Sequence, residues 1–265
     1  MGFQKKIKVK KIITKIFFST LSSKEKVEKY QKIIRENEWN DISKYISKNS
    51  SFLDVGCGAG YAMYRAKVDS NCEVNGVDPD PGAHGVGRFI ELFSKDEIHI
   101  TKGFAEKLPF ENEKFDVLYC SHVLEHVNDE QQAIIEMNRV LKDSGVAVIG
   151  MPSATMAFIS LVSQIVFTTH IKTYDFFRQF FKRGTLKRFL KIFIIESHSK
   201  PRAKYIFYDL IHYRESNWKK IVETQFKITK VIRPFLYPYP DFPQWFKIRK
   251  SKNFSSSVFF ICEKK

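Results

Sequence analysis

The feature that most constrains this fold is a series of short apolar runs between residues 52 and 151, separated by stretches with helical spacing. Five of these runs are candidate strands, with the sequences FLDV, EVNGV, EIHI, FDVLYC and VAVIGM. One of the intervening helices can be placed closely, because Asp129 is a suitable N-cap and an apolar stripe follows it. Strands that alternate with helices in this way predict an α/β fold with a parallel sheet and crossover helices.

Three glycines follow the first candidate strand within five residues, in the segment FLDVGCGAGY (52–61). A strand that runs through a glycine-rich turn into a helix places a ligand against free backbone N–H groups at the helix N-terminus. The turn lacks the Lys and Ser/Thr of a phosphate-binding P-loop, and its GxGxG spacing differs from the GxGxxG of dinucleotide sites. Asp78, at the end of the second strand, can accept hydrogen bonds from both hydroxyls of a ribose. The pattern favours a nucleoside without a phosphate clamp.

These motifs and three later ones resemble those of the class I S-adenosylmethionine-dependent methyltransferases, in particular the methyltransferase type 11 group. The segments are DVGCGAG, VDPD, AEKLPF, FDVLYCSHVLEHV and LKDSGVAVIGMPS, and they cover about residues 50–153. The resemblance implies a Rossmann-like, mostly parallel seven-stranded sheet with helices on both faces. It also implies S-adenosyl-L-methionine as the cofactor and no metal.

The resemblance further implies where the cofactor binds. Asp54 and the glycine turn would hold the methionyl end, Asp78 the ribose, and the turn at 104–106 the adenine. The complete expected set is Asp54, Gly56, Cys57, Gly58, Gly60, Asp78, Pro79, Phe104, Ala105, Glu106 and Ser121. Phe104 departs from the family pattern, since many members have an Asp there, and a Phe offers only stacking or backbone contacts to the adenine.

Methyl transfer is a direct displacement on a sulfonium methyl, so the protein mainly aligns the reactants and, where needed, removes a proton from the acceptor. His122 and His126 are spaced one helical turn apart just after the fourth strand and are the candidate general bases. The alternative for both is a structural histidine that hydrogen-bonds to the backbone. We expect Glu125 to be a solvated or capping acid and Cys120 to be a buried thiol at the strand end.

The chain divides into four parts by composition. Residues 1–49 form a basic N-terminal arm followed by two helices, and residues 50–151 form the cofactor-binding core. Residues 152–216 form an inserted helical lid rich in Phe, Lys and Arg, and residues 217–265 add a helix and strands that complete the core sheet. The Phe stripe of the lid is interpretable as a membrane-docking face, as a cover over an amphipathic acceptor, or simply as core.

The charge balance bears on partners, with 44 Lys and Arg against 29 Asp and Glu for a formal net charge of +15. Such a surface attracts phosphates, acidic lipids or acidic polymers. The four scattered cysteines suggest neither a disulfide framework nor a zinc site, and no apolar run is long enough for a membrane span. We therefore expect a cytoplasmic protein, with peripheral association at the inner face of the membrane as an open option.

The expected activity is transfer of a methyl group from S-adenosyl-L-methionine to an oxygen of a small-molecule, glycan or lipid-linked acceptor. Nucleic acid is disfavoured, because no proline-containing N-methylase motif follows the fourth strand and no RNA-binding module is recognisable. Two alternatives stay open. One is an RNA methyltransferase, and the other is a non-catalytic binding protein with a degenerate methyltransferase fold.

Overall fold

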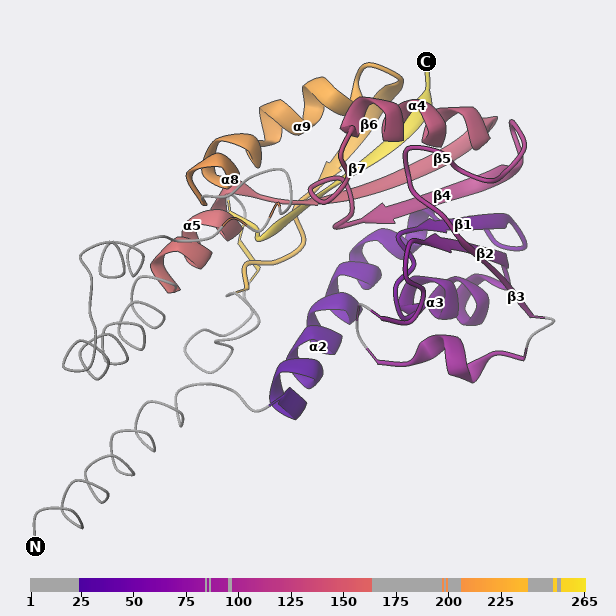
Figure 1. Ribbon diagram of the computed structural model, residues 1–265, viewed down its shortest axis with the longest axis horizontal. Helices are drawn as coiled ribbons and strands as arrows, with labels where there is room; N and C mark the ends of the chain where they lie inside the picture. The colour runs from indigo at the N-terminus through magenta and orange to yellow at the C-terminus, as the bar shows by residue number, and fades with distance from the viewer. Residues whose placement is uncertain are drawn as a thin grey trace, which may run out of the picture.

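The computed structural model describes residues 24–83, 85, 87–94, 97–163, 197, 199, 206–237, 250–251 and 254–265. The basic arm at residues 3–18 and the Phe-rich segment at residues 174–196, both singled out in the sequence, lie outside the described residues. The described part is built around a single twisted sheet (Figure 1).

Seven strands form this sheet in the order β3-β2-β1-β4-β5-β7-β6. Their bounds are β1 (Ser51–Val55), β2 (Glu73–Asp78), β3 (Ile98–Lys102), β4 (Phe115–Ser121), β5 (Leu141–Pro152), β6 (Phe226–Ile232) and β7 (Ser257–Lys264). Strands β1 to β5 pair in parallel, and β7 runs antiparallel to both β5 and β6. The Rossmann-like, mostly parallel sheet expected from the sequence is confirmed.

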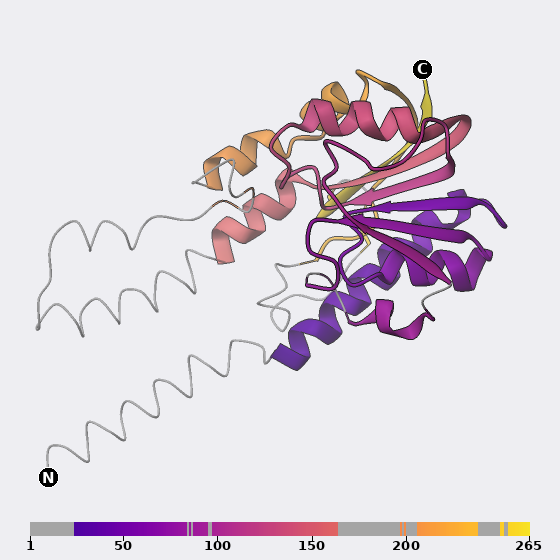
Figure 2. The same ribbon diagram turned by 45° about the vertical axis from the view of Figure 1, so that its right-hand side comes forward.

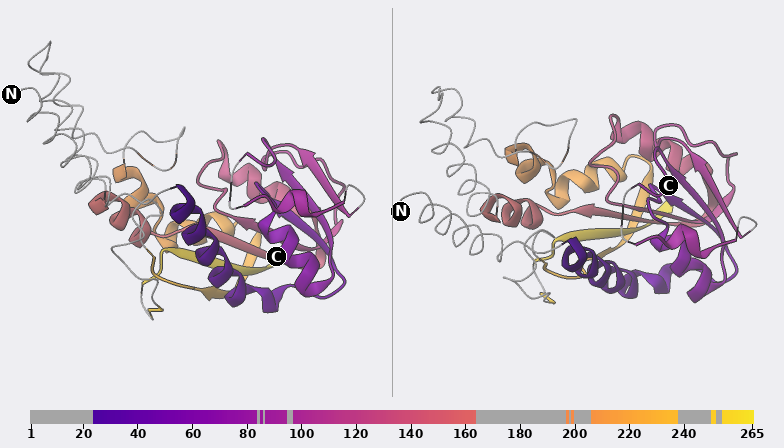
Figure 3. Two further views of the ribbon diagram at one scale, coloured as in Figure 1. Left: turned by 90° about the horizontal axis from the view of Figure 1, so that it is seen from below. Right: turned by 60° about the horizontal axis from the view of Figure 1, so that its bottom comes forward.

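Apolar side chains cover both faces of the sheet, which explains why its central strands are apolar without alternation. In β4, Leu118 and Cys120 join one buried cluster, while Val117 and Tyr119 join the cluster on the opposite face. One cluster packs under α2 (Lys24–Ile42), the 3-10 turn η1 (Ser43–Tyr45) and α3 (Tyr61–Ser70). The other packs under α4 (Glu130–Val140) and α9 (Glu215–Val222). Figure 2 and Figure 3 show these two groups of helices on opposite sides of the sheet.

Two further helices lie side by side at one end of the molecule (Figure 1). Helix α5 (Ala154–Ser163) follows directly from β5, and α8 (Ile206–His212) precedes α9. The indole Nε1 of Trp218 in α9 donates a hydrogen bond to the carbonyl of Pro152 at 2.9 Å, which joins this end to the core. Only these parts of the expected lid at 152–216 are described, so the lid and the other domain boundaries stay predictions. Within the described helices, none combines the length and apolar character that crossing a bilayer requires.

The N-terminal region differs from the two helices that the sequence predicted. Residues 24–42 form one continuous helix, α2, which passes through Asn37 without a break. The Asn37 side-chain amide donates to the carbonyl of Ile33 at 2.8 Å, so it bonds within the helix instead of ending it. The prediction of two helices was wrong, because residues 24–42 continue as one helix up to the 3-10 turn η1.

The connection between β2 and β3 also differs from the expected crossover helix. Among its described residues the helical element is the 3-10 turn η2 (Phe89–Leu92). Gly82, Gly85 and Gly87 have positive φ angles of 84°, 102° and 72°, which an α-helix cannot contain. The N-cap prediction for α4 is confirmed, since the Asp129 carboxylate accepts from the backbone N–H of Gln132 at 3.0 Å.

Candidate cofactor and acceptor site

The candidate site lies at the carboxyl end of β1, which has β2 on one side and β4 on the other. The strand order reverses direction there, and parallel α/β sheets bind their ligands in the crevice that such a reversal opens. The glycine turn, Asp78 and the segment after β4 all meet at this edge of the sheet.

The glycine turn is held in place by backbone hydrogen bonds to the end of β2. The N–H groups of Gly56 and Cys57 both donate to the carbonyl of Val77, at 2.7 and 3.2 Å. Gly56, Gly58 and Gly60 have φ angles of 76°, 47° and 82°, a left-handed region that favours glycine. The turn leads into α3, whose N-cap Gly60 provides no side-chain cap. The first N–H groups of α3 are thus donors suited to a carboxylate.

Two of these glycines also make room for protein side chains. A Cβ atom on Gly56 would overlap Val123, and one on Gly60 would lie 2.7 Å from the side chain of Ile90. The motif therefore serves the packing of the turn against its neighbours as well as the approach of a ligand.

Asp78 ends β2 beside the glycine turn and is buried. One carboxylate oxygen accepts from the N–H of Gly58 at 2.9 Å, and the other accepts from the N–H of Asp80 at 2.8 Å. A carboxylate has about four acceptor positions, so these two bonds fix its orientation and leave capacity for a diol. Pro79, next in the chain, is exposed at the same edge.

Asp54 lies in β1 next to this carboxylate and is only 4% exposed. Burial, reinforced by the negative charge of Asp78, raises the pKa of Asp54 from 3.8 to about 8. Burial also raises the pKa of the Cys57 thiol well above its usual range, so this thiol is neutral in the turn. A cation beside Asp54, such as the ammonium group of a methionyl moiety, would favour its ionised form.

The 104–106 turn stands at the same edge with its three residues in different environments. Phe104 is 61% exposed and pairs with Lys107 through an isolated β-bridge, whereas Ala105 is buried. The Glu106 carboxylate accepts from the N–H of Asn128 at 2.8 Å and so ties this turn to the segment before α4. An exposed Phe104 is available for stacking on a flat ring, the contact that its side chain allows.

The segment after β4 forms a series of turns, not the helix that the spacing of its histidines suggested. His122 takes a left-handed φ of 57°, and its N–H donates to the carbonyl of Gly150 at 2.9 Å. Its side chain is 10% exposed, whereas that of His126 is 42% exposed. Ser121 ends the strand, and its hydroxyl oxygen is buried without a hydrogen-bond partner among the described residues.

Glu125 is fully buried, so its expected role as a solvated or capping acid was wrong. Its carboxylate lies 3.3 Å from Nδ1 of His122 and 4.0 Å from Nε2 of His126. On the other side of His122, Nε2 lies 3.9 Å from the carboxylate of Glu38 in α2, which the sequence had not marked as part of the site. Cys120 is a fully buried strand-end residue, as predicted, and burial keeps its thiol protonated by raising its pKa.

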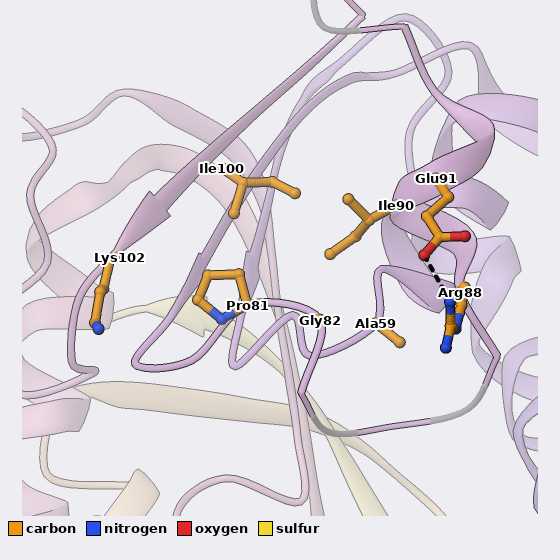
Figure 4. Close-up of a pocket in the computed structure, with 8 residues that line it drawn as sticks. All are labelled: Ala59, Pro81, Gly82, Arg88, Ile90, Glu91, Ile100 and Lys102. Atoms are coloured by element: carbon orange, nitrogen blue, oxygen red, sulfur yellow. Dashed lines mark hydrogen bonds and ion pairs between the residues drawn. The ribbon is translucent and has the colours of Figure 1, made fainter.

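A cavity of about 620 Å³ adjoins the glycine turn on the side that faces β3 (Figure 4). It lies between β3 and η2, and its lining residues are Ala59, Pro81, Gly82, Arg88, Ile90, Glu91, Ile100 and Lys102. Ala59 belongs to the glycine turn, and Gly82 donates to the carbonyl of Gly58 at 2.9 Å. Within the described part of the chain, no group of three His, Cys, Asp or Glu side chains could hold a metal ion.

Residues 53–149 match the protein family described as a methyltransferase domain. Residues 53–149 of this chain form a methyltransferase domain, similar to those of the class I S-adenosylmethionine-dependent methyltransferases. The match covers the glycine turn, Asp78, the 104–106 turn and the segment after β4. It confirms the resemblance seen in the sequence and S-adenosyl-L-methionine as the expected cofactor of this methyltransferase domain.

Two curated relatives and one solved structure illustrate the similarity. A tRNA U34 carboxymethyltransferase of Nautilia profundicola is 33% identical over 109 residues, which are 41% of this chain and 36% of that protein. A demethylmenaquinone methyltransferase of Staphylococcus aureus is 35% identical over 120 residues, 44% of this chain and 48% of that protein. The chain thus spans between about a third and a half of the length of these relatives. The S-adenosylmethionine-dependent methyltransferase structure from Mesorhizobium loti shares the fold, with a TM-score of 0.54, 15% identity, and coverage of 86% of this chain and 97% of that one.

Proposed function

We propose that this protein binds S-adenosyl-L-methionine at the glycine turn and catalyses methyl transfer to an acceptor beside the end of β4. The observation that carries this proposal is the placement of Asp54, Asp78 and the uncapped N-terminus of α3 around one turn at the reversal of strand order. These groups complement an ammonium, a ribose diol and a carboxylate respectively. The cofactor supplies a methyl group on a positively charged sulfur.

The chain's own contribution is to bind and orient the reactants. Asp78 is fixed by Gly58 and Asp80 before any ligand arrives, so its orientation costs little on binding. Exposed Phe104 and Pro79 offer the adenine apolar surface. Ser121 and the histidine turn lie on the β4 side of the glycine turn, where the acceptor would meet the methyl group.

The proposed acceptor atom is an oxygen, and the proposed general base is His126. Its side chain is 42% exposed, four times the exposed fraction of His122, so solvent and an acceptor can reach it. The two relatives are named for a tRNA and for demethylmenaquinone, so RNA and quinone-like acceptors enter the test beside small molecules and glycans.

Cofactor binding tests the first part of this proposal. Isothermal titration calorimetry of the whole chain with S-adenosylmethionine and with its demethylated product should give measurable heat for both. Asp78→Ala should weaken the affinity at least tenfold, since it removes a charge-assisted contact worth about 1.5–3 kcal/mol. Asp143→Asn, at a side chain that is 83% exposed, is the matched control. Absence of heat from the wild type would favour the non-catalytic binding protein instead.

The acceptor is found by a transfer assay with methyl-labelled cofactor against lipid, glycan, RNA and small-molecule fractions of cell extract. We expect label in the lipid, glycan or small-molecule fractions, and His126→Gln should reduce the rate at least tenfold with little change in cofactor affinity. Label confined to RNA would replace our acceptor class by the RNA alternative.

Exposed apolar residues on α5 and α8 support a second part of the proposed function, which is contact with an anionic lipid surface. Phe158 and Val162 in α5 are exposed and four residues apart, as are Phe207 and Ile211 in the adjacent α8. Residues of one helix that are four apart lie on the same face, so each helix has an exposed apolar strip. Between the two helices the sequence carries Lys172, Arg178, Lys182 and further basic residues outside the described part.

Co-sedimentation with vesicles containing about a third anionic lipid tests this element. The wild type should sediment at low salt, and the double variant with Phe158→Ser and Phe207→Ser should sediment at least threefold less. Val68→Ser, an exposed apolar residue of α3, is the control. A wild type that stays in the supernatant at low salt would rule out the lipid contact.

A further inference from the structure

A buried cluster of charged side chains joins helix α2 to the turn after β4. It contains Arg35 and Glu38 from α2, and His122 and Glu125 from the turn. The carboxylates of Glu38 and Glu125 lie on opposite sides of the His122 ring, at 3.9 Å from Nε2 and 3.3 Å from Nδ1. A single imidazole thus lies between two acids from different parts of the chain.

Three side chains other than His122 hold the Glu38 carboxylate in place. Nη1 of Arg35 donates to one carboxylate oxygen at 2.7 Å. The other oxygen accepts from the hydroxyl groups of Tyr237, at 3.1 Å, and Ser257, at 2.5 Å. These residues lie after β6 and in β7, more than 190 residues from Glu38 in the sequence. The carboxylate that faces His122 therefore has little freedom to move away.

Charge balance decides the protonation state of the ring. With Arg35 as the sole cation, the two buried carboxylates would leave one negative charge uncompensated, a costly state at this depth. Burial raises the pKa of Glu38, but Arg35 and His122 outweigh it and bring this pKa to about 2. Burial and Arg35 lower the pKa of His122, yet Glu125 and Glu38 together hold it above its usual value.

The remaining titratable neighbours are Tyr237, Tyr119 and His126, and none of them lies between the two carboxylates as His122 does. Tyr237 and Tyr119 are neutral, since burial raises both of their pKa values. Nε2 of His126 lies 4.0 Å from the Glu125 carboxylate, farther than the 3.3 Å of His122 Nδ1, and the His126 side chain is 42% exposed. His122 Nε2 and both Glu125 oxygens are buried without a hydrogen-bond partner among the described residues, so the attraction across these gaps is ionic.

We propose that His122 is a positioning residue that, as a buried imidazolium, joins Glu38 of α2 to Glu125 and so fixes the turn at 122–127 against α2. This role differs from that of a general base, because a base needs an accessible lone pair and a protonated ring has none. The turn that carries Ser121 and His126 at its ends is thereby coupled to the N-terminal helix. The inference stands on the cluster itself and does not depend on methyl transfer.

Nuclear magnetic resonance of the full chain, with 15N-labelled imidazole rings, tests the protonation state directly. At pH 7.5 we expect both ring nitrogens of His122 to show imidazolium shifts, with the signal assigned in the wild type by through-bond correlation to the His122 backbone. Glu38→Gln should reduce the proton affinity of His122 at least tenfold, whereas His126→Gln should leave the His122 signal unchanged. A neutral His122 ring at pH 7.5 in the wild type would overturn the proposal, and this readout does not require any variant to fold.

Hydrogen exchange tests the positioning role. Asn is chosen at position 122 because it tolerates the left-handed backbone there. His122→Asn should accelerate amide exchange in α2 and in residues 122–127 at least tenfold, while His126→Asn should not. Glu38→Gln should accelerate exchange less in the His122→Asn background than in the wild type, because the interaction between the two residues is already lost there. Equal acceleration by the two single histidine variants would contradict a specific link.

Discussion

Replacing Asp54 by Asn separates the stability of the fold from the affinity for the cofactor. Asp54 is 4% exposed beside Asp78, and its pKa rises from 3.8 to about 8. The folded protein therefore holds this carboxyl protonated at neutral pH, whereas the unfolded chain ionises it. A raised pKa on an acid lowers stability as pH increases from about 4 to about 8, and the loss is constant above that range.

The size of this effect follows from the shift. At about 1.4 kcal/mol per pKa unit, a shift of about 4 units corresponds to roughly 6 kcal/mol of destabilisation at pH 8 and above. Asn has nearly the same shape and carries no charge, so Asp54→Asn removes the pH-dependent penalty. The variant should thus be at least as stable as the wild type at pH 5, and clearly more stable at pH 8.

Urea unfolding measures the stability of Asp54→Asn, and calorimetry measures its affinity for the cofactor. Urea unfolding between pH 4 and pH 9 should give a free-energy difference between variant and wild type that grows with pH and levels off near pH 8. Calorimetry with S-adenosylmethionine should show affinity weakened about 10- to 100-fold, because a charged partner for the ammonium group is lost. In the wild type at pH 7, binding should release up to one proton, seen as a dependence of the binding heat on the buffer.

Asp143→Asn, at an exposed position, is the control for both assays and should change neither. A free-energy difference that stays constant across the pH range would refute the protonated state of Asp54. Proton release that persists in Asp54→Asn would refute its assignment to this residue.

Four further substitutions test other parts of the structure. Gly60→Ala should destabilise the fold by about 1–3 kcal/mol in urea unfolding and weaken cofactor binding, because its φ is 82° and Ile90 occupies the space for a Cβ; unchanged stability would contradict the strained turn. Gly150→Ala should cost about 1–3 kcal/mol, because a Cβ there would overlap Phe259, and smaller side chains at 259 should restore part of the loss. Glu38→Gln should remove stability that the wild type has above pH 4.5 and loses as pH falls towards 2, so acid unfolding curves of the two proteins should converge near pH 2. Asp129→Ala should cost about 1 kcal/mol through loss of the α4 cap without affecting cofactor affinity, which a combined unfolding and calorimetry measurement checks.

The sequence predicted the strands better than it predicted the connections between them. Strands β1 to β5 appear where the five apolar runs predicted them, and the central ones are buried on both faces, so that their composition alone marks them. The connection from β2 to β3 was mispredicted as a helix, although Gly82, Gly85 and Gly87 in its sequence already argued against one. The continuous helix α2 was missed, although its sequence contains no proline or glycine that would end a helix.

Prediction of the candidate site was similarly uneven. Asp54, the glycine turn and Asp78 are separated by few residues or by one βαβ unit, so the motif and the topology of parallel strands bring them together. The environment of His122 was not predictable in this way. Its spacing to His126 suggested that either histidine could be the base, at one helical turn from the other, whereas the turn geometry makes His122 nearly buried and His126 exposed.

By itself, the sequence determined the α/β class, the strands of the sheet and a turn that requires glycine, because backbone preferences and apolar patterning act over short distances along the chain. The tertiary structure alone decided which charges face each other. Pairing of β7 with β5 brings Ser257 and the nearby Tyr237 to Glu38 of the N-terminal helix, and the turn after β4 brings His122 to the same carboxylate. Protonation states depend on burial and on neighbours within a few ångströms, and those neighbours come from segments far apart in the sequence.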